Sequence, residues 1–254
     1  MPRVEVRGQP VSFAQVGDGP ALLLVHGSGG DHTVWGHQLQ GLKDRFTVTA
    51  LDLNGHGRSA HRDGDALAEY VTDVQAVMDQ LDQPTVVMGH SLGGAVAQTL
   101  ALERPPRLSG IGLIGTGGKL RVHPDLLATI DRDLGEAADV LAEWLFSESA
   151  PDDLREKARA QMKENGQSVL ARDFRACDAF DVMGRLNDID VAALVAVGEH
   201  DRMTPAKYSE HLREAIPNAY LRVIENAGHM VMLERPEALN DAIAEFMGQL
   251  EADA

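Results

Sequence analysis

The sequence predicts one α/β domain with a mostly parallel sheet, interrupted by a helical insertion. Short apolar runs bounded by Gly, Asp or Pro recur along the 254 residues, and segments with helical spacing separate most of them. Strands that alternate with helices form parallel sheets covered on both faces. The length suits one domain better than two, and a hydrophobic content of 44% is enough for a large buried core.

Eight strands are expected along the chain. Residues 3–16 alternate around Gly8-Gln9-Pro10, which predicts an antiparallel hairpin at the edge of the sheet. Six apolar runs predict buried strands at 22–25, 48–53, 86–88, 111–114, 194–197 and 221–224. Between the second and third runs, an apolar stripe predicts a helix with Leu67, Val71, Val74, Met78 and Leu81 on its buried side.

The alternation of strands and helices stops after Gly117 and Gly118. Residues 122 to 186 contain no convincing strand but four helical stripes: Leu126, Leu127 and Ile130; Val140, Leu141, Trp144 and Leu145; Leu154, Ala158 and Met162; Leu170, Phe174, Cys177 and Phe180. We therefore expect a core formed by residues 1–118 and 187–254, with residues 119–186 inserted as a helical cap. The apolar stripes are expected to form the cap's own core, and Cys177 to be a buried, inert thiol.

Charge and cysteine content exclude several classes of protein. The formal net charge is -16, whereas nucleic acids and anionic membranes are bound by clustered Lys and Arg. A single cysteine allows neither an intramolecular disulfide nor a zinc site built from thiolates. Charges near the N-terminus and the absence of long apolar runs argue against a signal peptide or a membrane span. We expect a soluble cytoplasmic protein that binds a small molecule, in an oligomeric state that the sequence leaves open.

Ser91 is the candidate nucleophile. It lies between Gly89 and Gly93 in the pattern G-x-S-x-G, between an apolar run and a helix with Leu92, Val96 and Leu100 on one face. A sharp turn from strand to helix exposes the serine hydroxyl, and the helix N-terminus directs the Leu92 N–H and a positive dipole end towards negative charge beside it. The alternative is a serine that only caps the helix.

The segment Gly-His-Ser-Leu-Gly-Gly at 89–94 resembles the nucleophile elbow of the α/β-hydrolase superfamily. Residues 24–30 resemble the HG loop of that family, and 52–59 resemble its D-x-x-G-x-G-x-S turn, with Asn54 where proline is common. The resemblance implies an eight-stranded α/β-hydrolase sheet with helices on both faces. It also implies that the Ser28 N–H completes an oxyanion hole with Leu92, while the turn at 52–59 braces the site without a catalytic role.

His229 is the expected general base. It follows the last predicted strand and precedes the last helix, in a loop that resembles the family's histidine loop. His90 is an alternative close to Ser91, although neighbours on a tight turn point in different directions, and His26 is expected to order its own loop by hydrogen bonding. The remaining histidines are expected to be ordinary surface or loop residues: His32, His37, His56, His61, His123, His200 and His211.

Asp201 is the expected acid. It follows the predicted strand 194–197 in a segment that resembles the family's G-x-x-D-x-x-x-P turn, and it would orient His229. Glu199 is the rival carboxylate. The alternative acid position at 115–118 has no carboxylate. The order Ser91, Asp201, His229 is the one found in this fold.

These residues predict an α/β-fold serine hydrolase, a carboxylesterase or lactonase that cleaves a small or medium ester or lactone through an acyl-enzyme on Ser91. Neither a metal nor an organic cofactor is expected. A carbon–carbon bond hydrolase of ring-cleavage diketones is one alternative, although its relatives usually have asparagine and tryptophan where His90 and Met230 lie. A cofactor-free perhydrolase or haloperoxidase and a non-catalytic ligand receptor are the others. The physiological substrate, its acyl chain and its leaving group stay open.

Overall fold

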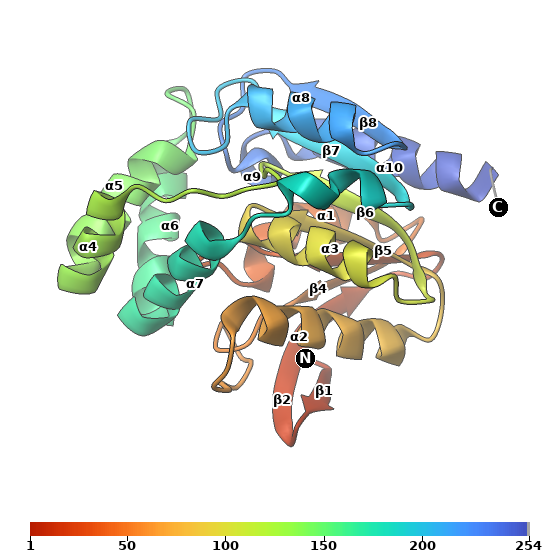
Figure 1. Cartoon of the computed structure of the whole chain (residues 1–254), viewed down its shortest axis with the longest axis horizontal. Coiled ribbons are helices and arrows are strands. Elements are labelled where there is room, and N and C mark those ends of the chain that lie inside the picture. The colour runs from red at the N-terminus through yellow and green to blue at the C-terminus, as the bar shows by residue number, and fades with distance from the viewer. Residues whose placement is uncertain (253–254) are drawn as a thin grey trace.

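The computed structural model describes residues 1–252, so the last two residues of the expected core segment 187–254 lie outside it. Eight strands form one sheet in the order β1-β2-β4-β3-β5-β6-β7-β8 (Figure 1). β2 runs antiparallel to β1 and β4, and all other neighbours are parallel, which confirms the predicted mostly parallel sheet. The strands are β1 (Arg3–Val6), β2 (Gln9–Val16), β3 (Ala21–Val25), β4 (Thr47–Leu51), β5 (Thr85–His90), β6 (Leu108–Ile114), β7 (Ala192–Gly198) and β8 (Ala219–Ile224).

The N-terminal hairpin turns earlier than the sequence indicates. Val6 pairs with Gln9, so the turn consists of Arg7 and Gly8 alone, and Pro10 is already within β2. Both turn residues have positive φ, 50° and 77°, as a two-residue turn with the twist of its strands requires. The predicted antiparallel hairpin at the sheet edge is confirmed, and only its turn lies earlier than 8–10, because the proline there is compatible with a strand near the sheet edge.

Helices cover both faces of the sheet. α2 (Ala66–Leu81), α3 (Leu92–Glu103) and α8 (Ala206–Ala215) pack on one face, and their apolar sides join one core cluster. α1 (Gly36–Leu42), α9 (Val231–Glu234) and α10 (Pro236–Ala252) contribute to a second cluster on the other face. Short 3-10 turns occur at His32–Trp35 and Met183–Asp188. The α/β arrangement predicted from the alternating pattern is therefore confirmed.

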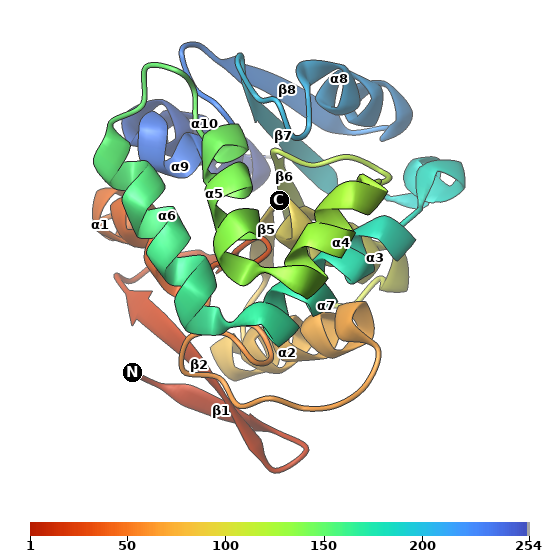
Figure 2. The ribbon, with the colours of Figure 1, turned by 90° about the vertical axis from the view of Figure 1, so that its left-hand side faces the viewer.

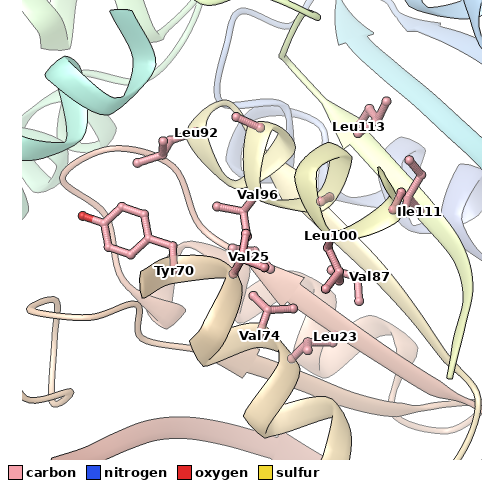
Figure 3. Close-up of a cluster of buried hydrophobic side chains, with 14 of the residues drawn as sticks. Leu23, Val25, Tyr70, Val74, Val87, Leu92, Val96, Leu100, Ile111 and Leu113 are labelled. Atoms are coloured by element: carbon pink, nitrogen blue, oxygen red, sulfur yellow. The ribbon is translucent and has the colours of Figure 1, made fainter. Parts of the chain in front are cut away.

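The close packing of α3 on the central strands fixes the start of that helix. Val96 and Leu100 of α3 are fully buried and face the strands that carry Val25 and Val87 (Figure 3). The ring of Tyr70, from α2, lies at the border of the same cluster, with its hydroxyl turned away from the apolar side chains (Figure 3). A helix buried in this way cannot shift along the sheet without losing its contacts, because protein interiors are close-packed.

Between β6 and β7 the chain forms four consecutive helices: α4 (Pro124–Arg132), α5 (Leu134–Leu145), α6 (Asp152–Asn165) and α7 (Gln167–Ala179). We call α4–α7 and their connections the helical segment. It lies at one end of the sheet in Figure 1, and Figure 2 turns this end towards the viewer. An isolated bridge and an ion pair between Lys119 and Asp181 join the two ends of the segment.

The helical segment has an apolar cluster of its own, with Ile130, Leu141 and Leu170 at its centre. Its helices also begin at recognisable caps, since Pro124 occupies the first turn of α4 and Asp133 accepts a hydrogen bond from Glu136 N–H at the start of α5. Among the helices that lie within residues 1–252, none has both the length and the hydropathy needed to cross a bilayer.

Truncation of a core side chain of α3 should destabilise the fold. Leu100 is fully buried, so Leu100→Ala is expected to lower the free energy of unfolding by about 3 kcal/mol through lost burial and a residual cavity. Val223→Ala, on exposed edge strand β8, should cost about 0.5 kcal/mol or less. Urea titration followed by circular dichroism measures both, and equal losses would contradict the buried position of Leu100.

Candidate active site

Loops from the carboxyl ends of several parallel strands converge under the helical segment, which is where sites form in sheets of this kind. The loops that follow β3, β5, β7 and β8 carry Ser28, Ser91, Thr204 and His229, and all four residues line one cavity of about 770 Å³. Helices of the segment form much of the remaining wall. The structure thus brings residues from distant parts of the chain to a single cavity.

Ser91 lies in the sharp turn between β5 and α3, in an unusual backbone conformation with φ 52° and ψ -113°. Its N–H donates to Ile114 O at 2.9 Å, and its own carbonyl accepts the Thr116 hydroxyl at 2.9 Å. A Cβ on Gly89 would collide with the carbonyl group of Gly93. The glycines of the G-x-S-x-G pattern are therefore required by backbone contact, and the turn holds Ser91 at the cavity wall.

His229 and Asp201 form a buried pair. His229 Nδ1 lies 2.9 Å from Asp201 Oδ2, and both side chains are almost completely inaccessible to solvent. Burial by itself raises the pKa of Asp201, but the neighbouring His229 and hydrogen bonds from His229 and Thr204 outweigh it and hold this pKa below its ordinary value. An ionised Asp201 accepts the Nδ1–H of His229 and leaves the Nε2 lone pair free.

The hydroxyl of Ser91 and the ring of His229 line the same cavity. In the part of the chain that the structure describes, no hydrogen bond joins Ser91 to His229. Hydrogen bonds between reacting groups are often long before substrate binds.

The backbone near Ser28 has a defined orientation. The Gly27 carbonyl accepts hydrogen bonds from His26 Nδ1 at 2.9 Å and Gly30 N–H at 3.1 Å. Because the peptide between Gly27 and Ser28 is trans, the Ser28 N–H points away from these donors. Within residues 1–252 no group accepts this N–H. Leu92 is the first residue of α3, so its N–H also has no partner inside the helix.

The rival side chains point elsewhere. His90 Nε2 lies 3.1 Å from the carbonyl of His229, so the ring of His90 braces the histidine loop. Burial, followed by the neighbouring His229, lowers the pKa of His90 well below its ordinary value. Glu199 is half exposed and accepts Asn226 N–H at 3.1 Å, which leaves Asp201 as the carboxylate that contacts His229.

Two expectations for the other histidines have different outcomes. His26 orders its loop as predicted, because one ring nitrogen contacts Gly27 O and the other accepts Leu53 N–H at 3.1 Å. His56, expected to be an ordinary surface or loop residue, is fully buried and contacts Asp173 of α7 at 2.8 Å. That expectation was wrong because the partner of His56 lies far along the chain, in the helical segment.

Thr204 and Glu234 are polar residues of the site that the sequence analysis did not single out. Thr204 donates to both oxygens of Asp201, through its N–H to Oδ1 and its hydroxyl to Oδ2, each at 2.8 Å. Asp is typical of turns because its side chain accepts backbone N–H groups a few residues later, as Asp201 does from Met203 and Thr204, but this signal does not single out Thr204. Glu234 accepts Gly228 N–H at 2.9 Å and Ser147 N–H at 3.0 Å, and thereby joins the histidine loop to the end of α5.

Several apolar residues of the helical segment have two roles. Met162 and Phe174 belong to the segment's own cluster, as predicted, but they also line the cavity. Trp144 lines the cavity too, and is 42% exposed, so it is not a core residue. Cys177 is buried in the cavity wall, 3.6 Å from the Ser28 hydroxyl, and burial raises the pKa of its thiol to about 12. The thiol is therefore protonated near neutral pH, as expected for an inert residue.

One group of side chains has the composition of a metal site, namely Asp31, His32 and Asp52. Both oxygens of each carboxylate already accept hydrogen bonds from the protein, including those from Gln161 to Asp31 and from Arg58 N–H to Asp52. His32 Nδ1 is also held by Asp52 at 2.7 Å. The donors that satisfy these groups explain the cluster as a brace between loops.

Comparisons with known proteins agree with this architecture. A model of the "Alpha/beta hydrolase family" matches residues 22–242. A 33% identical relative from Caulobacter sp. (strain K31), "Putative carbamate hydrolase RutD", aligns over 96% of this chain and 94% of its own. A solved thermophilic esterase is 34% identical with a TM-score of 0.89, covering 98% of this chain and 97% of that one. Est816, described as an N-acyl homoserine lactone degrading enzyme, is 28% identical with a TM-score of 0.88, covering 96% and 100%.

The buried His26 should make the stability of the fold depend on pH. Burial, followed by the nearby His56, lowers the pKa of His26 from 6.5 to about 4. The unfolded chain therefore binds a proton at higher pH than the folded chain does, and stability is lost as pH falls from the unfolded pKa towards the folded one. From pH 7 to pH 5, this group should remove about 2 kcal/mol from the free energy of unfolding.

His26→Gln retains one donor and one acceptor but does not titrate. Urea titrations at pH 7 and pH 5 measure the free energy of unfolding of both proteins. Between these two pH values, the decrease in the variant should be about 2 kcal/mol smaller than the decrease in the wild type. Equal pH dependence of the two proteins would show that His26 is not held neutral in the folded state.

Proposed function

The chain belongs to the alpha/beta hydrolase family, and on that premise we propose that it is a serine hydrolase that cleaves a small or medium carboxylic ester or lactone. The observation that carries this proposal is the strained turn that holds Ser91 at the wall of the same cavity as the buried pair of Asp201 and His229. We also propose that residues 119–186 act as a cap over this cavity. The expected catalytic residues are Ser91, Asp201 and His229.

Acylation begins with attack of Ser91 Oγ on the carbonyl carbon of the substrate. His229 Nε2 accepts the hydroxyl proton, because its Nδ1–H is already committed to Asp201 at 2.9 Å. The resulting imidazolium is stabilised by the ionised Asp201, which Thr204 keeps in place through two hydrogen bonds. His229 then returns the proton to the leaving alcohol as the carbon–oxygen bond breaks, leaving an acyl-enzyme on Ser91.

Negative charge on the former carbonyl oxygen needs donors that are already aligned. The N–H groups of Ser28 and Leu92 are proposed to bind it, and each such donor lowers the barrier by about 3 kcal/mol. Leu92 also lies at the positive end of the α3 dipole. Deacylation repeats the cycle with water: His229 takes one proton from the attacking water and gives it to Ser91 as the acid product leaves.

The cavity favours an apolar acyl group of moderate size. A volume of about 770 Å³ is within the range of small-molecule sites and leaves room beyond the scissile bond. Its wall in the helical segment is mainly apolar and includes Leu126, Leu141, Leu154, Ala158, Met162 and Phe174. Similarity to a thermophilic esterase and to an N-acyl homoserine lactone degrading enzyme supports an ester or a lactone as the substrate.

A carbamate is a second candidate substrate, because the 33% identical relative bears the name "Putative carbamate hydrolase RutD". A carbamate ester has a carbonyl carbon that the same serine can attack, and the products are an alcohol and a carbamic acid. The size and apolar wall of the cavity support an acyl ester more strongly than a carbamate without an apolar group. Parallel assays with esters, lactones and alkyl carbamates of matched size separate the two candidates.

Replacement of the proposed catalytic residues should abolish turnover. With p-nitrophenyl butyrate, Ser91→Ala and His229→Ala are each expected to lower kcat by about a millionfold, and Asp201→Asn by about ten-thousandfold because the imidazole adopts the wrong tautomer. Glu199→Gln is the matched control on the rival carboxylate and should stay within about twofold of the wild type. Retained activity in His229→Ala would move the role of base to His90.

The apolar wall of α6 should limit the length of the acyl chain. Ala158 is half-buried and lines the cavity, so Ala158→Phe is expected to lower kcat/KM for a p-nitrophenyl octanoate by about tenfold or more, with little change for the acetate. Ala160 lies on the same helix but is exposed, and Ala160→Phe serves as the control. A uniform effect on both esters would show that α6 does not contact the acyl group.

A further inference from the structure

We propose that Asp173, on α7, is a positioning residue for the oxyanion hole: its carboxylate holds the Gly29 N–H and thereby fixes the direction of the Ser28 N–H. This inference rests on the proposed function, because it assigns a task to a residue that does not touch the substrate. Asp173 Oδ2 accepts Gly29 N–H at 2.9 Å, and the side chain is completely buried. The helical segment would thus take part in building the catalytic loop as well as in covering the cavity.

Each of the two peptide units beside Ser28 is held at one polar group. Two peptide units flank the α-carbon of Ser28, and the first is held through the Gly27 carbonyl by His26 and Gly30. The second is held through the Gly29 N–H, whose acceptor within residues 1–252 is Asp173. The Ser28 N–H belongs to the first unit, and the contact to Asp173 holds the second. With both units held, the φ and ψ angles of Ser28 are restrained, and the first unit cannot rotate to turn its N–H away from the cavity.

The carbonyl groups of Gly29 and Gly30 are also held by the helical segment. Asn165, the last residue of α6, donates from Nδ2 to Gly29 O at 2.9 Å and to Gly30 O at 3.0 Å. Gly29 has φ +67°, and a Cβ there would collide with Leu170 of α7. A glycine-rich loop is intrinsically mobile, so its order in this site depends on partners outside it.

The environment of Asp173 keeps its carboxyl group ionised. Burial raises the pKa of Asp173, but His56 and hydrogen bonds from His56, Tyr70 and Gly29 outweigh this effect and hold the pKa below its ordinary value. His56 Nε2 lies 2.8 Å from Asp173 and Nδ1 lies 3.2 Å from Asn54 O. The carboxylate of Asp173 places its negative charge against the Gly29 N–H.

A purely structural role is the competing explanation, because Asp173 also joins α7 to the core through Tyr70. The Tyr70 hydroxyl donates to Asp173 Oδ1 at 2.5 Å, on the oxygen that does not contact Gly29. Tyr70→Phe therefore disturbs the same buried cluster and leaves the contact to Gly29 in place. Loss of stability alone cannot distinguish the two roles, whereas a selective loss of transition-state binding can.

The experiment compares Asp173→Leu, Asp173→Asn and Tyr70→Phe in ester hydrolysis, with folding checked by circular dichroism and thermal unfolding. Asp173→Leu removes the acceptor for Gly29 N–H at similar size and should lower kcat by about a hundredfold with KM within about threefold. Asp173→Asn keeps an acceptor oxygen without the charge and should restore part of the activity, leaving a loss of about tenfold. Tyr70→Phe should lose stability and keep kcat within about twofold.

Inhibitor binding gives a second measurement on the same proteins. A trifluoromethyl ketone forms an oxyanion when the serine adds to it, so its inhibition constant should rise by the same factor by which kcat/KM falls in each Asp173 variant. The inhibition constant of a carboxylate product should not change. If Asp173→Leu does not fold, Asp173→Asn alone tests the proposal. A tenfold fall in its kcat/KM together with a tenfold rise in its inhibition constant for the ketone supports the positioning role.

The positioning role would be overturned if the Asp173 variants had the same kcat and the same inhibition constant for the ketone as Tyr70→Phe. A rise in KM at unchanged kcat in the Asp173 variants would also overturn it. These results differ from a failure of the proposed function. In that case the wild-type protein would hydrolyse none of the esters and lactones, or Ser91→Ala would retain the wild-type rate. A hydrolase that depends on Ser91 but not on Asp173 would reject only the present inference.

Discussion

The backbone conformation of Ser91 is the constraint on which the rest of the site depends. A non-glycine residue with φ 52° and ψ -113° is costly by about 1 to 3 kcal/mol, and it persists only where its surroundings leave no alternative. Here the strand pairing on one side supplies the Ile114 carbonyl for Ser91 N–H, and Thr116 holds the Ser91 carbonyl. The tight fit of Gly89 against Gly93 completes the restraint, so the hydroxyl position is set by the packing of α3 on the sheet.

The helical segment is attached to loops that follow three different strands near Ser91. Asp173 of α7 accepts Gly29 N–H, Arg202 donates to the carbonyls of Glu143 and Phe146, and Glu234 accepts Ser147 N–H. Each contact links a different strand-end loop to the segment. The same helices therefore shape the cavity and restrain the loops, and a change in the segment is expected to affect both the shape of the cavity and the positions of these loops.

The sequence predicts features that depend on residues close together in the chain better than features that depend on distant residues. The turn around Ser91 and the strands beside it depend on neighbours within a few residues, so the G-x-S-x-G pattern and the apolar runs indicate them directly. Asp201 and His229 were identified from their places after strands and from family resemblance, and the structure places them in contact. Such positions are predictable because parallel strands end at the same edge of the sheet.

Contacts across the fold were not predictable in this way. His56 and Asp173 are far apart in the sequence, and neither lies in a local pattern that reveals a buried contact between them. Trp144 was assigned to the core of the helical segment because helical spacing shows which residues share a face, but not which face meets a cavity. The hairpin turn at Arg7 and Gly8 was displaced in the prediction because a positive φ at Arg7 has no sequence signal comparable to glycine.

Covalent capture of the intermediate tests the central claim most directly. The wild-type protein is mixed with p-nitrophenyl acetate, quenched in acid before deacylation is complete, and digested for peptide mass spectrometry. The proposed mechanism predicts one added acetyl group on the peptide that contains Ser91, with fragment ions that place it on this residue. Full turnover without any acetylated Ser91, or with the acetyl group on another residue, would contradict it.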